Sequence, residues 1–81
     1  MSDALLDVRG LTCPLPVLRA KKTLKTIPHG ARLTVMATDP SSVRDFQIFC
    51  QQTGHCLEEW SEDAEGVFRY LIRKVDKSDV G

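Results

Sequence analysis

The residues best suited to chemistry are Cys13 and the prolines around it, in the run Cys-Pro-Leu-Pro at residues 13–16. An apolar run over residues 4–8 predicts a strand before this turn, and a helical pattern over residues 17–27 follows it. Cys13 would therefore lie where a strand leads into a helix. Pro14 would be the first helical residue, where its missing N–H costs nothing and its fixed φ suits the helix.

A helix start of this kind predicts a positive electrostatic environment for the Cys13 sulfur. The backbone amides of Leu15 and Val17 would be free donors near the sulfur, and the positive end of the helix dipole would favour an anion. A thiolate is such an anion, so we expect a reactive Cys13 with a lowered pKa. The alternative is that Cys13 is a small buried apolar side chain, as most free cysteines are.

The turn contains no second thiol. In a thioredoxin-like dithiol, the second cysteine would stand at position 16, which Pro16 occupies. A single activated thiolate suits a nucleophile or a group carrier better than a disulfide exchanger.

Size, charge and cysteine content are those of a small domain in a reducing compartment. The chain has 81 residues, three cysteines and no net charge, so we expect one domain over residues 1–81 with reduced thiols. No apolar run approaches the length of a membrane span, and the N-terminus shows no secretory signal. We therefore expect a cytoplasmic protein without membrane contact.

The charges are unevenly distributed along the sequence. Residues 1–35 hold six basic and two acidic side chains, whereas residues 36–81 hold five basic and nine acidic ones. This pattern places the positive half around Cys13 and would attract an acidic partner surface or RNA. The alternative for any one lysine is a solvated helix face, and the zero net charge gives no argument for nucleic acid.

Apolar periodicity predicts four strands and two helices in the order β-α-β-α-β-β. The expected strands cover residues 4–8, 32–38, 55–62 and 67–75, and the expected helices cover residues 17–27 and 42–53. The fold class is therefore an α/β (α+β) two-layer sandwich, a mixed four-stranded sheet with both helices on one face. The open face would carry Thr34, Thr38, Arg69 and Arg73, and residues 75–81 would be a frayed tail.

The sequence resembles the TusA (SirA-like) sulfur-carrier family over nearly its whole length, from Leu5 to about Lys74. The residues that carry this resemblance are Leu6 to Pro16, Lys21-Lys22, Asp39-Pro40, Asp45-Phe46, Cys50 and Gly54-His55. The resemblance implies the same two-layer fold, like that of the C-terminal domain of translation initiation factor three. It also implies that Cys13 carries sulfane sulfur as a persulfide.

Family resemblance further implies a sulfur relay between proteins. Its members typically accept sulfur from a cysteine desulfurase and pass it to a downstream acceptor protein, commonly toward 2-thiouridine in tRNA. Relatives in sulfur-oxidising bacteria move sulfur between oxidation enzymes instead. For this chain we expect such a donor and acceptor, no cofactor, no metal and no direct nucleic-acid binding.

Several residues near Cys13 are candidates for shaping the site or binding partners. Site-shaping residues would be Pro14, Leu15, Pro16, Arg9 and Gly10. Partner-binding residues would be Arg9, Arg19, Lys21 and Lys22, and Arg9 could also aid thiolate formation. Asp7 could hydrogen-bond within the turn or simply end the strand.

The other cysteines and helix-start residues have simpler interpretations. Cys50 lies on the apolar stripe of the second helix and is expected in the core, and Cys56 is expected to be structural. Their spacing around His55 is not a recognised zinc pattern. Asp39 and Ser42 are expected to cap the second helix.

Three functional classes remain open from the sequence. The first is a sulfur carrier without turnover of its own, which we favour. The second is a thiol enzyme acting on a small donor, for which the sequence shows no pocket residues. The third is a regulatory or RNA-binding module that uses the basic helix.

Overall fold

The computed structural model describes residues 3–75, which form four strands and two helices in the predicted order. The elements are β1 (Ala4–Asp7), α1 (Leu15–Leu24), β2 (Arg32–Ala37), α2 (Ser42–Thr53), β3 (Cys56–Glu62) and β4 (Phe68–Arg73). The predicted βαβαββ succession is confirmed.

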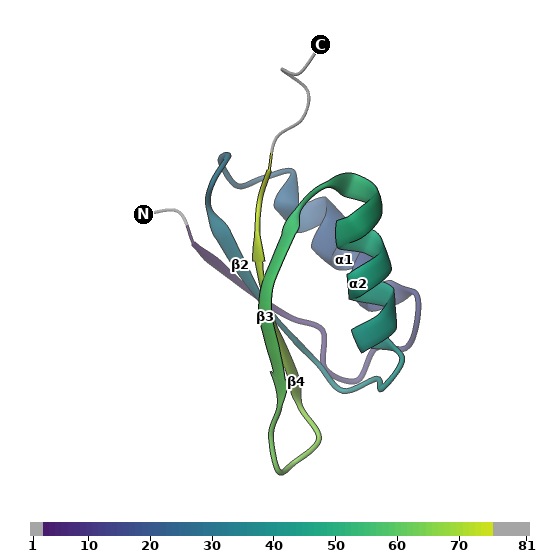
Figure 1. Cartoon of the computed structure of the whole chain (residues 1–81). Coiled ribbons are helices and arrows are strands. Elements are labelled where there is room, and N and C mark those ends of the chain that lie inside the picture. The colour runs from purple at the N-terminus through teal and green to yellow at the C-terminus, as the bar shows by residue number, and fades with distance from the viewer. Residues whose placement is uncertain (1–2, 76–81) are drawn as a thin grey trace.

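The strands form one mixed sheet in the order β1-β2-β4-β3. β1 runs parallel to β2, whereas β4 is antiparallel to both of its neighbours. Both helices lie on the same face of this sheet (Figure 1). The two-layer sandwich expected from the sequence is therefore correct, and each βαβ unit returns the chain across that face.

The core lies between the helices and the sheet, because strand residues alternate between the two faces. Along β2 every second residue is buried, and the same holds for β4. The buried side chains that fill this layer include Leu33, Val35, Ala37, Phe68, Tyr70 and Ile72 from the strands and Ala20, Leu24, Phe46 and Phe49 from the helices. Burying one such large side chain stabilises the fold by about 1.5–3 kcal/mol.

The opposite face of the sheet carries the predicted polar side chains Thr34, Arg69 and Arg73, together with the exposed Leu5, and is crossed by ion pairs. A register irregularity between Leu57 and Glu59 leaves Glu58 opposite no residue of β4. The Glu58 carboxylate accepts hydrogen bonds from Arg32 at 2.7 Å and from Arg73 at 3.0 Å. These pairs link β2, β3 and β4 on the solvent side.

The ends of α1 differ from those predicted. The helix begins at Leu15 and ends at Leu24, instead of running from residue 17 to 27. After Leu24, the amides of Lys25 and Thr26 each bond to a carbonyl three residues earlier. The last turn is thus tighter than an α-helix, although Ile27 still reaches the core.

Two further predictions concern membrane contact and the C-terminal tail. Within residues 3–75, neither helix is long and apolar enough to cross a membrane. Of the tail predicted to be frayed, residues 76–81 lie outside the described residues.

Candidate functional site at Cys13

Cys13 lies on the exposed turn between β1 and α1. Pro14 is the N-cap of α1 and not its first residue, and its carbonyl accepts the amide of Leu18 at 3.1 Å. The Leu15 amide donates to the carbonyl of Thr12 at 2.9 Å. The Leu15 amide is therefore not a free donor for the Cys13 sulfur, and the prediction was wrong for this residue.

Gly10 shapes the turn through its backbone. Its φ is +84°, a left-handed conformation that side chains disfavour. The Gly10 amide donates to the hydroxyl of Thr38, just beyond β2, at 2.9 Å. This bond ties the turn that carries Cys13 to the neighbouring strand.

Asp39 fixes the backbone at Cys13. Its Oδ2 accepts the Cys13 amide at 2.6 Å, and its Oδ1 accepts both the amide and the hydroxyl of Ser41 at 3.0 and 2.9 Å. The Ser41 amide, followed by the Cys13 amide, lowers the pKa of the Asp39 carboxyl, so it is ionised at neutral pH. Asp39 thus links the turn before α1 to the start of α2.

The prediction that Asp39 and Ser42 cap α2 was wrong. The N-cap residue is Ser41, and no side chain makes a capping hydrogen bond there. Asp39 stands two residues too early and bonds to the Cys13 amide instead. Ser42 is already helical, and its buried hydroxyl bonds to the Tyr70 hydroxyl at 2.6 Å.

Carboxylates of α2 and of the loop before it control the ionisation of Cys13. The hydrogen bond to Asp45 is the largest influence, and it raises the pKa of the Cys13 thiol above its usual range. Desolvation and the charges of Asp45 and Asp39 act in the same direction, whereas a hydrogen bond from Ser41 opposes them. The lowered pKa expected from the start of α1 was therefore wrong, because two anionic groups face the sulfur.

Arg9 is held by Asp7 and not by the cysteine. The guanidinium donates to both carboxylate oxygens of Asp7, at 2.9 and 2.8 Å, and the Arg9 amide donates to the same group at 3.0 Å. These bonds lower the pKa of Asp7 to about 2. The hydrogen bond that the sequence allowed for Asp7 is present, but Arg9 is not among the groups that shift the Cys13 pKa.

A hollow of about 180 Å³ lies beside the turn, between α1 and α2. Its lining is mainly apolar and consists of Pro14, Val17, Asp45, Ile48, Phe49 and Gln52. Leu15, Leu18 and Ile48 are large apolar side chains exposed to solvent. This surface can receive part of another protein next to Cys13.

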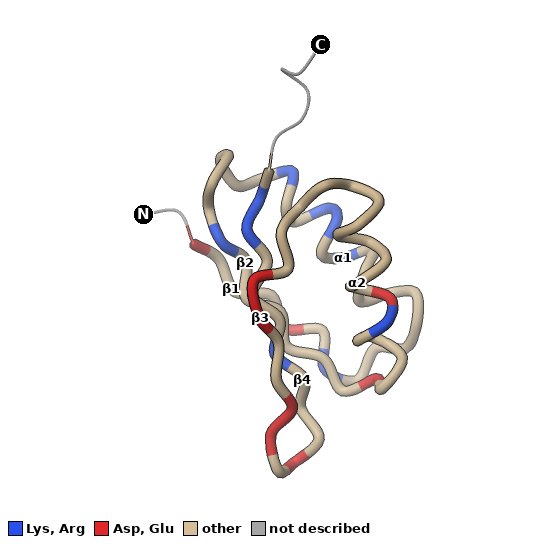
Figure 2. Tube along the Cα trace, viewed as in Figure 1, with Lys and Arg blue, Asp and Glu red and all other residues tan. Residues whose placement is uncertain are grey.

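Three of the four basic residues predicted to bind partners lie on α1, whose basic positions are blue in Figure 2, whereas Arg9 lies on the turn before it. Arg19, Lys21 and Lys22 are all exposed. Lys21 and Lys22 lie in the last turn of α1, at the end away from Cys13. The positive half of the sequence is therefore not centred on the cysteine, and the charged groups that shift the pKa of Cys13 are the carboxylates of Asp45 and Asp39.

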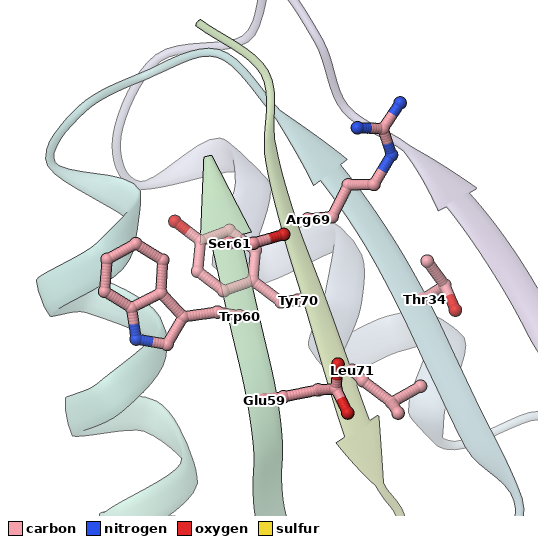
Figure 3. Close-up of a pocket in the computed structure, with 7 residues that line it drawn as sticks. All are labelled: Thr34, Glu59, Trp60, Ser61, Arg69, Tyr70 and Leu71. Carbon is pink, nitrogen blue, oxygen red and sulfur yellow. The ribbon is translucent and has the colours of Figure 1, made fainter. Parts of the chain in front are cut away.

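A second hollow, of about 230 Å³, lies over β2, β3 and β4 and does not include Cys13 (Figure 3). Two of the polar side chains that line this hollow already bond to other residues. Arg69 is paired with Asp63 at 2.9 Å, and the Tyr70 hydroxyl is bonded to Ser42. It offers no thiol for sulfur chemistry.

The other two cysteines lie apart from this site. Cys50 is buried in the core, as predicted, and burial raises its pKa to about 11. Cys56 is half-buried at the start of β3. No disulfide and no group of side chains that could hold a metal ion is found among residues 3–75.

Sequence reasoning missed Asp39 and Asp45 as neighbours of the thiol. Asp39 was interpreted as a helix cap, and Asp45 entered only through the family resemblance. Both are far from Cys13 along the chain, and the amide contact to Asp39 spans 26 residues. The only available signal was that Asp39-Pro40 and Asp45-Phe46 belong to the resemblance.

Comparisons with known proteins show which family the sequence matches. The profile of the family described as "Sulfurtransferase TusA" matches residues 4–74. The sulfur carrier protein TusA of Allochromatium vinosum is 54% identical over 72 residues, which cover 89% of this chain and 93% of that protein. A putative sulfur carrier protein of Neisseria meningitidis is 51% identical, covering 90% and 97%.

A solved structure shows the same fold. The crystal structure of a SirA-like protein from Desulfitobacterium hafniense has a TM-score of 0.79 and 30% sequence identity to this chain. The match covers 90% of this chain and 99% of that protein.

Proposed function

Because the chain belongs to the TusA family, we propose that it carries sulfane sulfur as a persulfide on Cys13. The observation that best supports this proposal is the exposed thiol on a turn fixed at its own amide by Asp39. An exposed sulfur on a rigid turn is accessible to two different proteins in succession. Family membership supports the sulfur-carrier role in general.

The loading step is a transfer between two cysteines. The Cys13 thiolate attacks the terminal sulfur of a donor persulfide, a new sulfur–sulfur bond forms, and the bond between the two donor sulfurs breaks. The donor cysteine leaves as a thiolate, so charge and sulfur balance without an oxidant. The acceptor's thiolate then repeats the step on the Cys13 persulfide.

The surroundings of Cys13 support a carrier in preference to an enzyme. Among residues 3–75, Asp45 is the only charged residue that lines the hollow beside the turn, so few polar groups are available there to orient a small substrate. The raised pKa of Cys13 also keeps the free protein mainly in the thiol form at neutral pH. A partner that neutralises Asp45 on docking would raise the thiolate fraction.

Intact-mass analysis tests this proposal. The full chain is incubated with a cysteine desulfurase, its cofactor and cysteine, with and without reductant, as wild type, Cys13→Ser and Cys56→Ser. We expect a reductant-sensitive gain of one sulfur in wild type and Cys56→Ser, and no gain in Cys13→Ser. An equal gain in Cys13→Ser would assign the sulfur to another cysteine and refute the proposal.

We further propose that the donor is a cysteine desulfurase, that the cytoplasm is the compartment, and that the sulfur goes to 2-thiouridine in tRNA. Support comes from what the family resemblance implies and from the free thiols of all three cysteines. A strain lacking the gene should lose tRNA 2-thiouridine, and wild type but not Cys13→Ser should restore it. Unchanged 2-thiouridine would favour the relay in sulfur oxidation.

A further inference from the structure

A third hollow, of about 200 Å³, lies at the end of the helices away from Cys13. Its lining consists of Lys21, Leu24, Lys25, Phe49, Thr53, His55 and Lys74. The residues come from α1, α2, the segment before β3 and the end of β4, so tertiary packing alone assembles them. Three of these seven are lysines, and within residues 3–75 no carboxylate lines the hollow.

The hollow combines an apolar floor with a cationic rim. Leu24 and Phe49 are buried, whereas Lys21 and Lys25 are exposed and one helical turn apart on α1. Lys74 is half-buried, and its ammonium donates one hydrogen bond, to the carbonyl of Ile27 at 2.6 Å. An ammonium has three donors, so two N–H groups of Lys74 remain beyond this bond.

The competing explanation is that these lysines only stabilise the fold. Lys25 is the C-cap of α1, and cations are stabilised at helix C-termini by the helix dipole. That explanation accounts for Lys25, for Lys21 in the last turn of α1 and for the Lys74 bond to Ile27. It does not account for the placement of all three lysines around one hollow, where three positive charges meet on a concave surface.

We propose that this hollow binds a tetrahedral oxyanion, namely a phosphate group. Lysine binds phosphate as a point charge, and three ammonium groups around a concavity can approach different oxygens of one anion. Thr53 lies on the same rim, although its hydroxyl hydrogen is donated to the Phe49 carbonyl. The phosphate could be free or part of a phosphodiester, since both present the same charged oxygens. The site is independent of the sulfur step, because it lies about 15 Å along α1 from the cysteine turn.

The test is a titration of the full-length ¹⁵N-labelled protein with sodium phosphate at constant ionic strength, followed by amide chemical shifts. We expect saturable shifts at the amides around Lys21, Thr53 and Lys74. In Lys21→Gln/Lys25→Gln the affinity should fall about fivefold or more. Lys22→Gln removes the same kind of charge from the same turn but does not line the hollow, so its affinity should stay within about twofold of wild type.

A parallel titration with a short single-stranded oligoribonucleotide identifies the source of the phosphate. Tighter binding of the oligonucleotide at the same amides would indicate a phosphodiester, and equal or weaker binding would indicate a free phosphate. The proposal is overturned if phosphate causes no more shift than chloride at equal ionic strength. It is also overturned if Lys22→Gln weakens binding as much as the double variant.

Discussion

Cys13 is an exposed thiol that faces two carboxylates, Asp45 and Asp39. This environment opposes the thiolate, because each carboxylate repels a negative sulfur and Asp45 stabilises the protonated form by accepting its hydrogen. A persulfide anion at the same position would experience the same repulsion. We therefore expect the Cys13 thiolate to form mainly when a docked partner changes the charges around the sulfur, and the thiol to be less reactive in the free protein.

Asp45→Asn should shift the reactivity of Cys13 toward lower pH. The amide removes the negative charge that faces the sulfur, and its NH2 group can donate a hydrogen bond to a thiolate. The pKa of Cys13 therefore falls, and more thiolate is present at pH 7. The measurement is the rate of Cys13 alkylation by iodoacetamide between pH 6 and 10. Glu59→Gln, which removes a charge on the opposite sheet face, is the control and should leave the profile unchanged. A profile unmoved by Asp45→Asn would refute the assigned influence of Asp45.

Contacts at the start of α2 fix its position relative to the sheet and to the turn that carries Cys13. At the start of α2, the buried Ser42 hydroxyl meets the Tyr70 hydroxyl of β4, and the rings of Tyr70 and Phe46 lie 4.6 Å apart. Just before it, Asp39 reaches across to the turn that leads into α1. The start of α2 therefore connects the sheet to the cysteine turn, and its position decides how the carboxylates face Cys13.

Tyr70→Phe should destabilise the protein by about 1–3 kcal/mol, because it leaves the Ser42 hydroxyl buried without its partner. Ser42→Ala should cost a similar amount for the complementary reason. The double variant should be more stable than the sum of the two single effects predicts, since neither hydroxyl is then left alone. Urea denaturation of the four proteins measures this coupling, and strictly additive effects would contradict the buried pair.

At the scale of the whole molecule, folding separates the charges by region. Basic residues lie along α1 and at the C-terminal end of β4, and acidic residues gather at the β3–β4 hairpin (Figure 2). The cysteine turn lies at the other end of α1 from the lysines of its last turn. A partner can therefore be attracted by α1 as a whole while the sulfur reacts at one end of it.

Neutralising α1 should slow sulfur loading without altering the thiol. For Arg19→Gln/Lys22→Gln we expect loading from an acidic donor surface to fall about tenfold at low ionic strength. In about 0.5 M salt the loading rates of this variant and of wild type should become more similar, because salt screens the long-range attraction between α1 and the donor. Arg69→Gln/Arg73→Gln is the matched control on the opposite sheet face. A loss of loading that is equal in both double variants, or a change in Cys13 alkylation, would argue against a docking role for α1.

The sequence alone determined the elements and the position of the thiol. Periodicity is a local property, so the alternation in β2 and β4 and the apolar stripe of α2 specified the layers correctly. The Cys-Pro-Leu-Pro run predicted that Cys13 lies between a strand and a helix, and the structure showed that its thiol is exposed and not buried. The ends of α1 were predicted wrongly, because a final tightened turn and an N-cap proline depend on hydrogen bonds that apolar periodicity does not report.

Only the tertiary structure decided the electrostatics of that thiol. The helix start at Cys13 predicted a lowered pKa, but packing of α1 against α2 brings Asp39 and Asp45 to the sulfur from the other half of the chain. The lysine-lined hollow at the opposite end arises in the same way, from Lys21, Lys25 and Lys74. Electrostatic interactions depend on the distance between groups in the folded protein. Spacing along the sequence predicts that distance only within a single helix or strand.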